Sequence, residues 1–281
     1  MVDLWALGFV FLAGLLTALA TGIGAVPFLI FSEVSDRWNV ALWGVASGIM
    51  LSASVFGLVF EALGPSVRVS SQGVSVTSVP QRVWLLLVGG LLAGAVVVFV
   101  AHDIIEATDV DPGEYAEADF RRLVLILGVL TVHSFPEGVA VGVSFADLGI
   151  AGGTEVFGVA VPLLAVFMTV AISIHNVPEG VAISIPLRSM GVPDWKLVQW
   201  SVFSSLPQPI GAVLAFYFVR VARELLPAGF GFAAGAMIYL VITEFLPEAR
   251  EIGSTLPNGG RRELVGGFTA GVVAMVPLLL V

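Results

Sequence analysis

The sequence His133-Ser-Phe-Pro-Glu-Gly138 lies inside a long apolar stretch, and its pattern returns as His175-Asn-Val-Pro-Glu-Gly180. Residues four apart lie on one face of a helix, so each run places a His beside a Glu. Each Pro also removes a backbone donor and frees the carbonyl four residues before it. Ionisable groups in a bilayer interior cost several kcal/mol, so a helix that carries them there is expected to use them. Two such helices predict a metal site inside a membrane protein.

The composition indicates an all-α integral membrane protein. The 281 residues are 58% hydrophobic and only 12% charged, with a mean hydropathy of +1.02, whereas a soluble domain is about a quarter charged. The chain has no cysteine, which excludes disulfides and thiolate metal sites. A metal must therefore be held by His, carboxylate, amide or backbone oxygen.

The apolar runs predict eight transmembrane helices, each long enough to cross about 30 Å of hydrocarbon. The first run reads as a spanning helix and not as a signal peptide. We expect residues 1–281 to form a single transmembrane domain, with an acidic cytoplasmic loop at 102–121. The expected spans are 4–31, 41–63, 83–101, 122–146, 158–186, 198–222, 229–249 and 264–281.

Lys and Arg gather on one side of this predicted topology, and that side is expected to be cytoplasmic. Both termini then lie outside a plasma membrane. The richer side holds Arg37, Arg121, Arg122, Arg188, Lys196, Arg250, Arg261 and Arg262, and the other holds Arg68, Arg82, Arg220 and Arg223.

A weak internal repeat relates the second and seventh expected spans. An odd number of spans separates the two copies, so they point in opposite directions, as in the inverted repeats of transporters. The alternative is chance similarity between glycine-rich membrane helices. At one constant offset Gly44, Gly48, Met50 and Glu61 align with Gly231, Gly235, Met237 and Glu248.

The two motif helices offer four ligands, and together these can surround one divalent cation. His133 and Glu137 come from one helix, and His175 and Glu179 come from the other. Two carboxylates neutralise a doubly charged ion, which matters in a medium of low dielectric constant. The spacing lacks the two-His helix signature of a zinc protease.

Further polar residues lie near the motifs. We include Ser134, Asn176 and Gln208 among the candidate metal-binding residues and place Glu244 and Glu248 on a possible pathway. A smaller set near the ends of expected spans is interpreted as boundary charges, with residues at the mouth of the pathway as the alternative: Glu61, His102 and Asp103.

The sequence resembles the ZIP (Zrt/Irt-like) divalent metal transporters, specifically their GufA-like prokaryotic branch. The resemblance covers essentially the whole chain and includes both Pro-Glu-Gly runs, Ala20-Thr-Gly-Ile-Gly-Ala-Val-Pro27, Gly48-Ile-Met-Leu-Ser-Ala-Ser54, Ser205-Leu-Pro-Gln-Pro-Ile-Gly211, Ala233-Ala-Gly-Ala-Met-Ile-Tyr239, Glu244 and Pro247-Glu248. It implies eight helices in a 3+2+3 arrangement and metal uptake toward the cytoplasm.

The resemblance also implies that His133, Glu137, His175 and Glu179 form the main transport site. Relatives often hold a second metal at the residue after each His and at a Glu between the prolines of the sixth span. Ser134, Asn176 and Gln208 stand at those positions and cannot carry charge. We therefore expect one well-formed metal site.

The expected function is uptake of a divalent transition metal, with zinc first and iron, manganese or cadmium next. The metal is a transported substrate and not a cofactor, and spans 1–3 and 6–8 are expected to rock around the central pair. An intramembrane metal-dependent hydrolase and a metal sensor without transport are the alternatives; the expectation is that the chain is not an enzyme. The expected partners are the metal ion and the lipid bilayer, with no nucleic acid, and a homodimer is one option for assembly.

Overall fold

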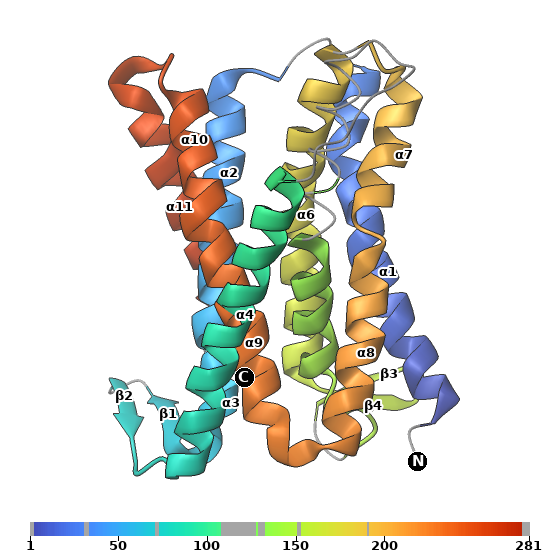
Figure 1. The fold of residues 1–281 in the computed structure, drawn as a ribbon, viewed down its shortest axis with the longest axis vertical. Coiled ribbons are helices and arrows are strands. Elements are labelled where there is room, and N and C mark those ends of the chain that lie inside the picture. Colours follow the sequence, from blue (N-terminus) through green and yellow to red (C-terminus); the bar gives the residue numbers. More distant parts are fainter. Residues whose placement is uncertain are drawn as a thin grey trace.

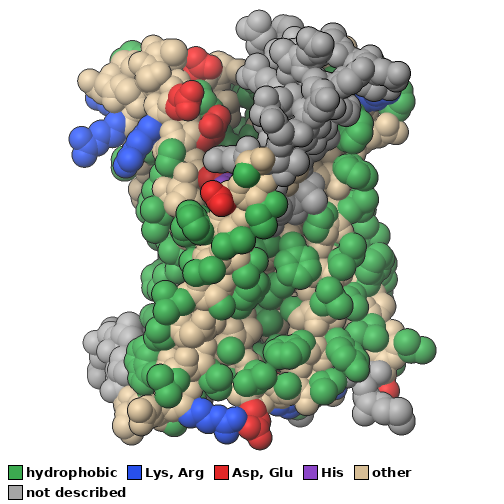
Figure 2. All heavy atoms as spheres, viewed as in Figure 1, with side chains coloured by type: hydrophobic (Ala, Val, Ile, Leu, Met, Phe, Trp, Pro, Cys, Tyr) green, Lys and Arg blue, Asp and Glu red, His purple; other side chains and the backbone are tan. Residues whose placement is uncertain are grey.

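The computed structural model describes residues 3–30, 34–70, 73–107, 128, 133–150, 153–189 and 191–276. Long helices run side by side along the longest axis of the molecule (Figure 1). Apolar side chains cover the middle of the visible face, whereas most charged side chains gather toward its two ends (Figure 2). Leu16, Leu92 and Leu214 are 61%, 63% and 55% exposed, as expected for side chains that face lipid.

Most of the described chain is helical. Its long elements, in order, are α1 (Leu4–Ala25), α2 (Asp36–Ser52), α4 (Gln81–Ala107), the helical segment 133–144, α6 (Leu163–Ser189), α7 (Asp194–Ser204), α8 (Pro207–Val221), α9 (Leu226–Leu240), α10 (Leu246–Gly253) and α11 (Arg261–Ala274). Short elements extend or join them: η1 (Val26–Leu29), η2 (Ala53–Val59), α3 (Phe60–Leu63), η3 (Gly64–Ser66), η4 (Arg223–Leu225), η5 (Val241–Phe245) and η6 (Pro257–Gly260).

Within the described residues, six helical stretches are long and apolar enough to cross a membrane. They correspond to the expected spans 1, 2, 3, 5, 6 and 7. Of expected span 4, residues 122–127 and 129–132 lie outside the described residues, and of expected span 8, residues 277–281 do. The described parts of these two spans, 133–144 and α11, are helical.

Two boundaries differ from the sequence prediction. Helix α4 continues to Ala107, so 102–107 is helix and not loop, because no Gly or Pro interrupts the chain between Gly94 and Pro112. The remainder of the expected acidic loop, 108–121, lies outside the described residues. Helix α6 begins at Leu163 and not at 158.

Two short antiparallel hairpins occupy the end of the molecule at which α1 begins (Figure 1). The first pairs β1 (Val67–Ser70) with β2 (Gly73–Val76), and the second pairs β3 (Thr154–Val156) with β4 (Val159–Val161). Phe157 and Gly158 both have positive φ between the strands of the second hairpin. This tight turn, followed by Pro162, replaces the expected first helical turn.

The helices divide into two packing groups. In the first, α2 packs along α11 and α4 packs along α9. A Cβ added at Gly94 would lie 2.0 Å from the carbonyl oxygen of Phe232, and one added at Gly48 would lie 2.2 Å from that of Phe268. Only glycine permits such close contact between helix backbones.

The second packing group contains α1, 133–144, α6, α7 and α8. A Cβ at Gly180 would lie 1.9 Å from the carbonyl oxygen of Thr21, and one at Gly138 would lie 2.1 Å from that of Gln208. Helix α1 therefore packs closely on α6 at Gly180, and α8 packs closely on 133–144 at Gly138.

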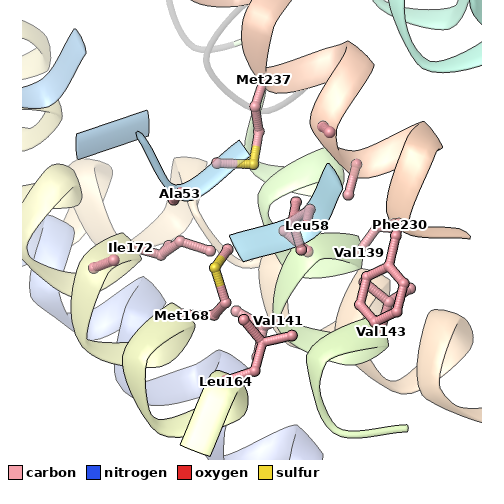
Figure 3. Packing of buried hydrophobic residues seen from close by; sticks show 14 of the residues in the cluster. Ala53, Leu58, Val139, Val141, Val143, Leu164, Met168, Ile172, Phe230 and Met237 are labelled. Carbon is pink, nitrogen blue, oxygen red and sulfur yellow. The ribbon is translucent and has the colours of Figure 1, made fainter. Parts of the chain in front are cut away.

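The two groups meet in an apolar core (Figure 3). Ala53 and Leu58 come from η2, Met237 from α9, Met168 from α6 and Val139 from 133–144, and all are buried. Along α6, Leu164, Met168 and Ile172 precede His175 at successive turns. This core therefore separates the motif residues from the hairpin end of the molecule.

Candidate metal centre

Prolines shape the helices that carry the motif. Helix α6 contains Pro178, and 133–144 contains Pro136. Neither proline can donate a backbone hydrogen bond, so a carbonyl one turn earlier in each helix lacks its helical donor. Segment η5 is a π-helix that ends two residues before Pro247. Single π-turns inside α-helices are frequent at functional sites.

The first ligand group contains Glu137, His175 and Glu179, whose ligand atoms all lie within 4.8 Å of one another. Glu137 and His175 are completely buried, and Glu179 is 1% exposed. His175 Nε2 lies 3.2 Å from Glu137 Oε1. Neither carboxylate oxygen of Glu179 has a hydrogen-bond partner among the described residues. A buried carboxylate without a donor is very costly, so this group is arranged for a cation.

A chain of amide side chains holds the other oxygen of Glu137. Gln208 Nε2 donates to Glu137 Oε2 at 2.6 Å, and Asn176 Nδ2 lies 3.0 Å from Gln208 Oε1 and 2.7 Å from the carbonyl oxygen of Thr17. The chain crosses from 133–144 through α8 and α6 to α1. Ser134 is also fully buried. In this arrangement Asn176 and Gln208 position a ligand.

The second ligand group contains His102, His133 and Glu244. His102 Nε2 lies 2.9 Å from Glu244 Oε1, His133 Nε2 lies 2.9 Å from Glu244 Oε2, and the two Nε2 atoms are 2.9 Å apart. His133 therefore faces a different group from Glu137, His175 and Glu179. Among the described residues, the four expected ligands fall into two groups and not one.

The side chain of Phe245 lies between the two ligand groups. Its ring stacks on that of His175 with centroids 5.2 Å apart, and its edge meets His133 at 6.5 Å. Of the other acidic residues named from the sequence, Glu61 and Glu248 are exposed, on α3 and α10. Glu244 joins the second ligand group, and His102 does so too, although the sequence analysis interpreted it as a boundary residue.

The sequence profile described as ZIP zinc transporter matches residues 102–276. The chain belongs to the ZIP zinc transporter family. It is 31% identical to zinc transporter GufA of Myxococcus xanthus, over 95% of this chain and 96% of that protein. It is 32% identical to zinc transporter ZIPB of Bordetella bronchiseptica, over 96% of this chain and 80% of that protein.

A longer plant relative also matches this ZIP family chain. It is named "Putative zinc transporter At3g08650" of Arabidopsis thaliana and is 40% identical over 83% of this chain. The match spans only 33% of that protein. Both ligand groups lie within the residues that the ZIP profile covers.

Proposed function

We propose that this protein moves divalent transition metals, zinc first, across the plasma membrane into the cytoplasm. The observation that carries the proposal is the buried carboxylate of Glu179, which lies beside Glu137 and His175 and has no hydrogen-bond partner in the described part of the chain. A divalent cation at this position would bind one imidazole and two carboxylates, so the loaded group is close to neutral. Iron, manganese and cadmium fit the same ligands. The names of the bacterial relatives support zinc as the first choice.

We assign the buried group as the cargo site, with His133 able to complete it by a change of rotamer. Gln208 and Asn176 fix the orientation of Glu137 through the amide chain, and Ser134 lies next to His133. The cargo site then holds one metal ion.

We propose that residues 1–281 form one domain and that this domain transports metal and does not catalyse a reaction.

We propose that the two packing groups are the bodies that move. The sequence predicts rocking of spans 1–3 and 6–8 around the central pair, whereas in the structure α1 packs on α6, α7 and α8. An open apolar groove of about 450 Å³ lies between the groups, with Leu86 and Phe232 on one side and Phe135 and Leu214 on the other.

The proposed inverted repeat gains support from paired contacts. The offset that aligns Gly44 with Gly231 also aligns Thr21 with Gln208, and these two carbonyl oxygens contact Gly180 and Gly138. The same offset brings the π-helix η2 onto η5. An inverted repeat of this kind permits two exchangeable arrangements around a central site.

The inward direction rests on two features. The core residues Leu164, Met168 and Ile172 precede His175 along α6, on its hairpin side. His102 and Glu244, on the opposite side, are 19% and 21% exposed. That opposite end carries the Lys- and Arg-rich connections, which favour the cytoplasm. The side of the buried cargo site that is nearer to solvent, through His102 and Glu244, is therefore the proposed cytoplasmic side.

The test is zinc entry into liposomes that hold the purified protein and a trapped zinc-sensitive dye. Glu179→Gln keeps the shape of the side chain and removes its charge, so we expect it to abolish most zinc entry. Glu251→Gln is the control, because Glu251 is exposed on α10. Equal zinc entry by wild type and Glu179→Gln contradicts the proposed cargo site.

A further inference from the structure

With Glu244 ionised, no assignment of protons to the two imidazoles satisfies the contacts within the group His102, His133 and Glu244. Each Nε2 atom either carries one proton or presents one lone pair. If both carry protons, the two N–H groups oppose each other over 2.9 Å; if one lacks a proton, its lone pair faces a carboxylate oxygen at 2.9 Å. Protonation of a ring to the cation leaves this conflict unchanged, because its Nε2 still has a single proton.

A divalent cation resolves this conflict, because all three ligand atoms then direct lone pairs at one centre. Tetrahedral zinc with bonds of about 2.0–2.1 Å holds its ligand atoms roughly 3.3 Å apart. The observed spacing of 2.9 Å requires only a small outward movement of each side chain. Two imidazoles and one carboxylate leave a fourth position for water or a further ligand.

The three ligands come from both packing groups. His102 lies on α4 and Glu244 on η5, which belong with α2, α9 and α11, whereas His133 lies on 133–144, which packs on α8. A metal bound by all three would therefore join the two bodies that must separate during transport. It would also keep His133 away from the buried group.

We propose that His102, His133 and Glu244 form a second divalent-metal site, distinct from the cargo site, which when loaded holds the two packing groups in the arrangement described. The site lies on the more exposed side of the cargo group, so metal that has already crossed reaches it first. Accumulated cytoplasmic metal would then slow further uptake. This last consequence rests on the proposed transport function, whereas the existence of the second site does not.

Zinc binding by the purified protein tests the site without any measurement of flux. After equilibrium dialysis and elemental analysis we expect two zinc ions per wild-type chain and one for His102→Ala and for His102→Gln. The His102→Gln variant keeps a hydrogen-bond donor toward Glu244. It therefore separates loss of the metal ligand from loss of the fold. Asp103→Ala, at the exposed neighbouring position on α4, should keep both ions.

The two proposals can fail separately in this measurement. If Glu179→Gln loses one ion and both His102 variants lose none, the second site is wrong and the cargo site stands. If the His102 variants lose one ion and Glu179→Gln loses none, the cargo site is wrong and the second site stands.

Flux provides the test of the holding role. Zinc on the cytoplasmic face should reduce wild-type uptake several-fold, and His102→Gln should remove most of that reduction. The same reduction in both proteins would overturn the holding role.

Discussion

Gln208 donates a 2.6 Å hydrogen bond from Nε2 to Oε2 of Glu137, and both side chains are completely buried. The opposite oxygen, Oε1, faces His175 Nε2. The amide thus fixes which carboxylate oxygen is presented to the other ligands. Because the Gln208 amide is neutral, it orients the Glu137 carboxylate without neutralising the negative charge that binds the cation.

Removal of this donor should weaken metal binding. We expect Gln208→Ala to lower zinc affinity about 10-fold, because a hydrogen bond to a charged group contributes about 1.5–3 kcal/mol and about 1.4 kcal/mol corresponds to tenfold. Isothermal titration of zinc into the purified protein measures the change. Gln199→Ala, at an exposed position on α7, should bind like wild type. An unchanged affinity in Gln208→Ala would show that Glu137 needs no such support.

Adjacent glycines on α4 provide a matched test of the helix packing. A Cβ at Gly90 would lie 2.3 Å from the carbonyl oxygen of Ala228, whereas a Cβ at Gly89 would have no neighbour within 4 Å. We expect Gly90→Ala to destabilise the protein by about 1–3 kcal/mol through overpacking. Gly89→Ala should be neutral or stabilising by up to about 1 kcal/mol, because alanine favours helix. Thermal unfolding in detergent measures both, and equal melting temperatures would rule out the close contact of α4 with α9.

Local sequence features sufficed to predict most of the helices, because apolar length alone defines a membrane span. They also selected Glu137, His175 and Glu179, which the structure brings together, since a repeated His and Glu at a spacing of four is improbable in lipid. They did not separate His133 from these three residues. The division into two packing groups was not predictable in this way. It depends on which glycine faces meet, and the faces of α1 and α4 look alike in composition.

His102 was missed although a sequence signal existed. Gly90, Gly94, Val98 and His102 follow one another at a spacing of four on α4. The glycines contact α9, and Val98 is 1% exposed. His102 therefore continues the buried face of the helix and points toward η5. A histidine at the end of an apolar run is also typical of a span boundary, and only its helical face distinguishes the two positions.

The charge of Glu179 should have opposite effects on stability in the absence and presence of metal. Without metal, a buried carboxylate that lacks partners destabilises the fold, so Glu179→Gln should raise the melting temperature of the chelator-treated protein. With saturating zinc, wild type gains stability from the bound ion and the variant gains less. Thermal unfolding with chelator and with zinc measures this crossover. A variant less stable than wild type under both conditions would indicate a structural role for the carboxylate.

Acidification should reduce zinc uptake, because the ligands bind metal only in their deprotonated forms. Protons and zinc then compete for His175, Glu137 and Glu179, and the apparent zinc affinity falls as pH decreases. We expect the zinc concentration for half-maximal uptake to rise as the pH falls. Uptake into liposomes at several pH values, with equal pH on both sides to exclude a driving proton gradient, measures the effect. His175→Gln removes the imidazole from the competition, so its residual uptake should depend less on pH; an identical pH profile would show that His175 is not a ligand of the transported metal.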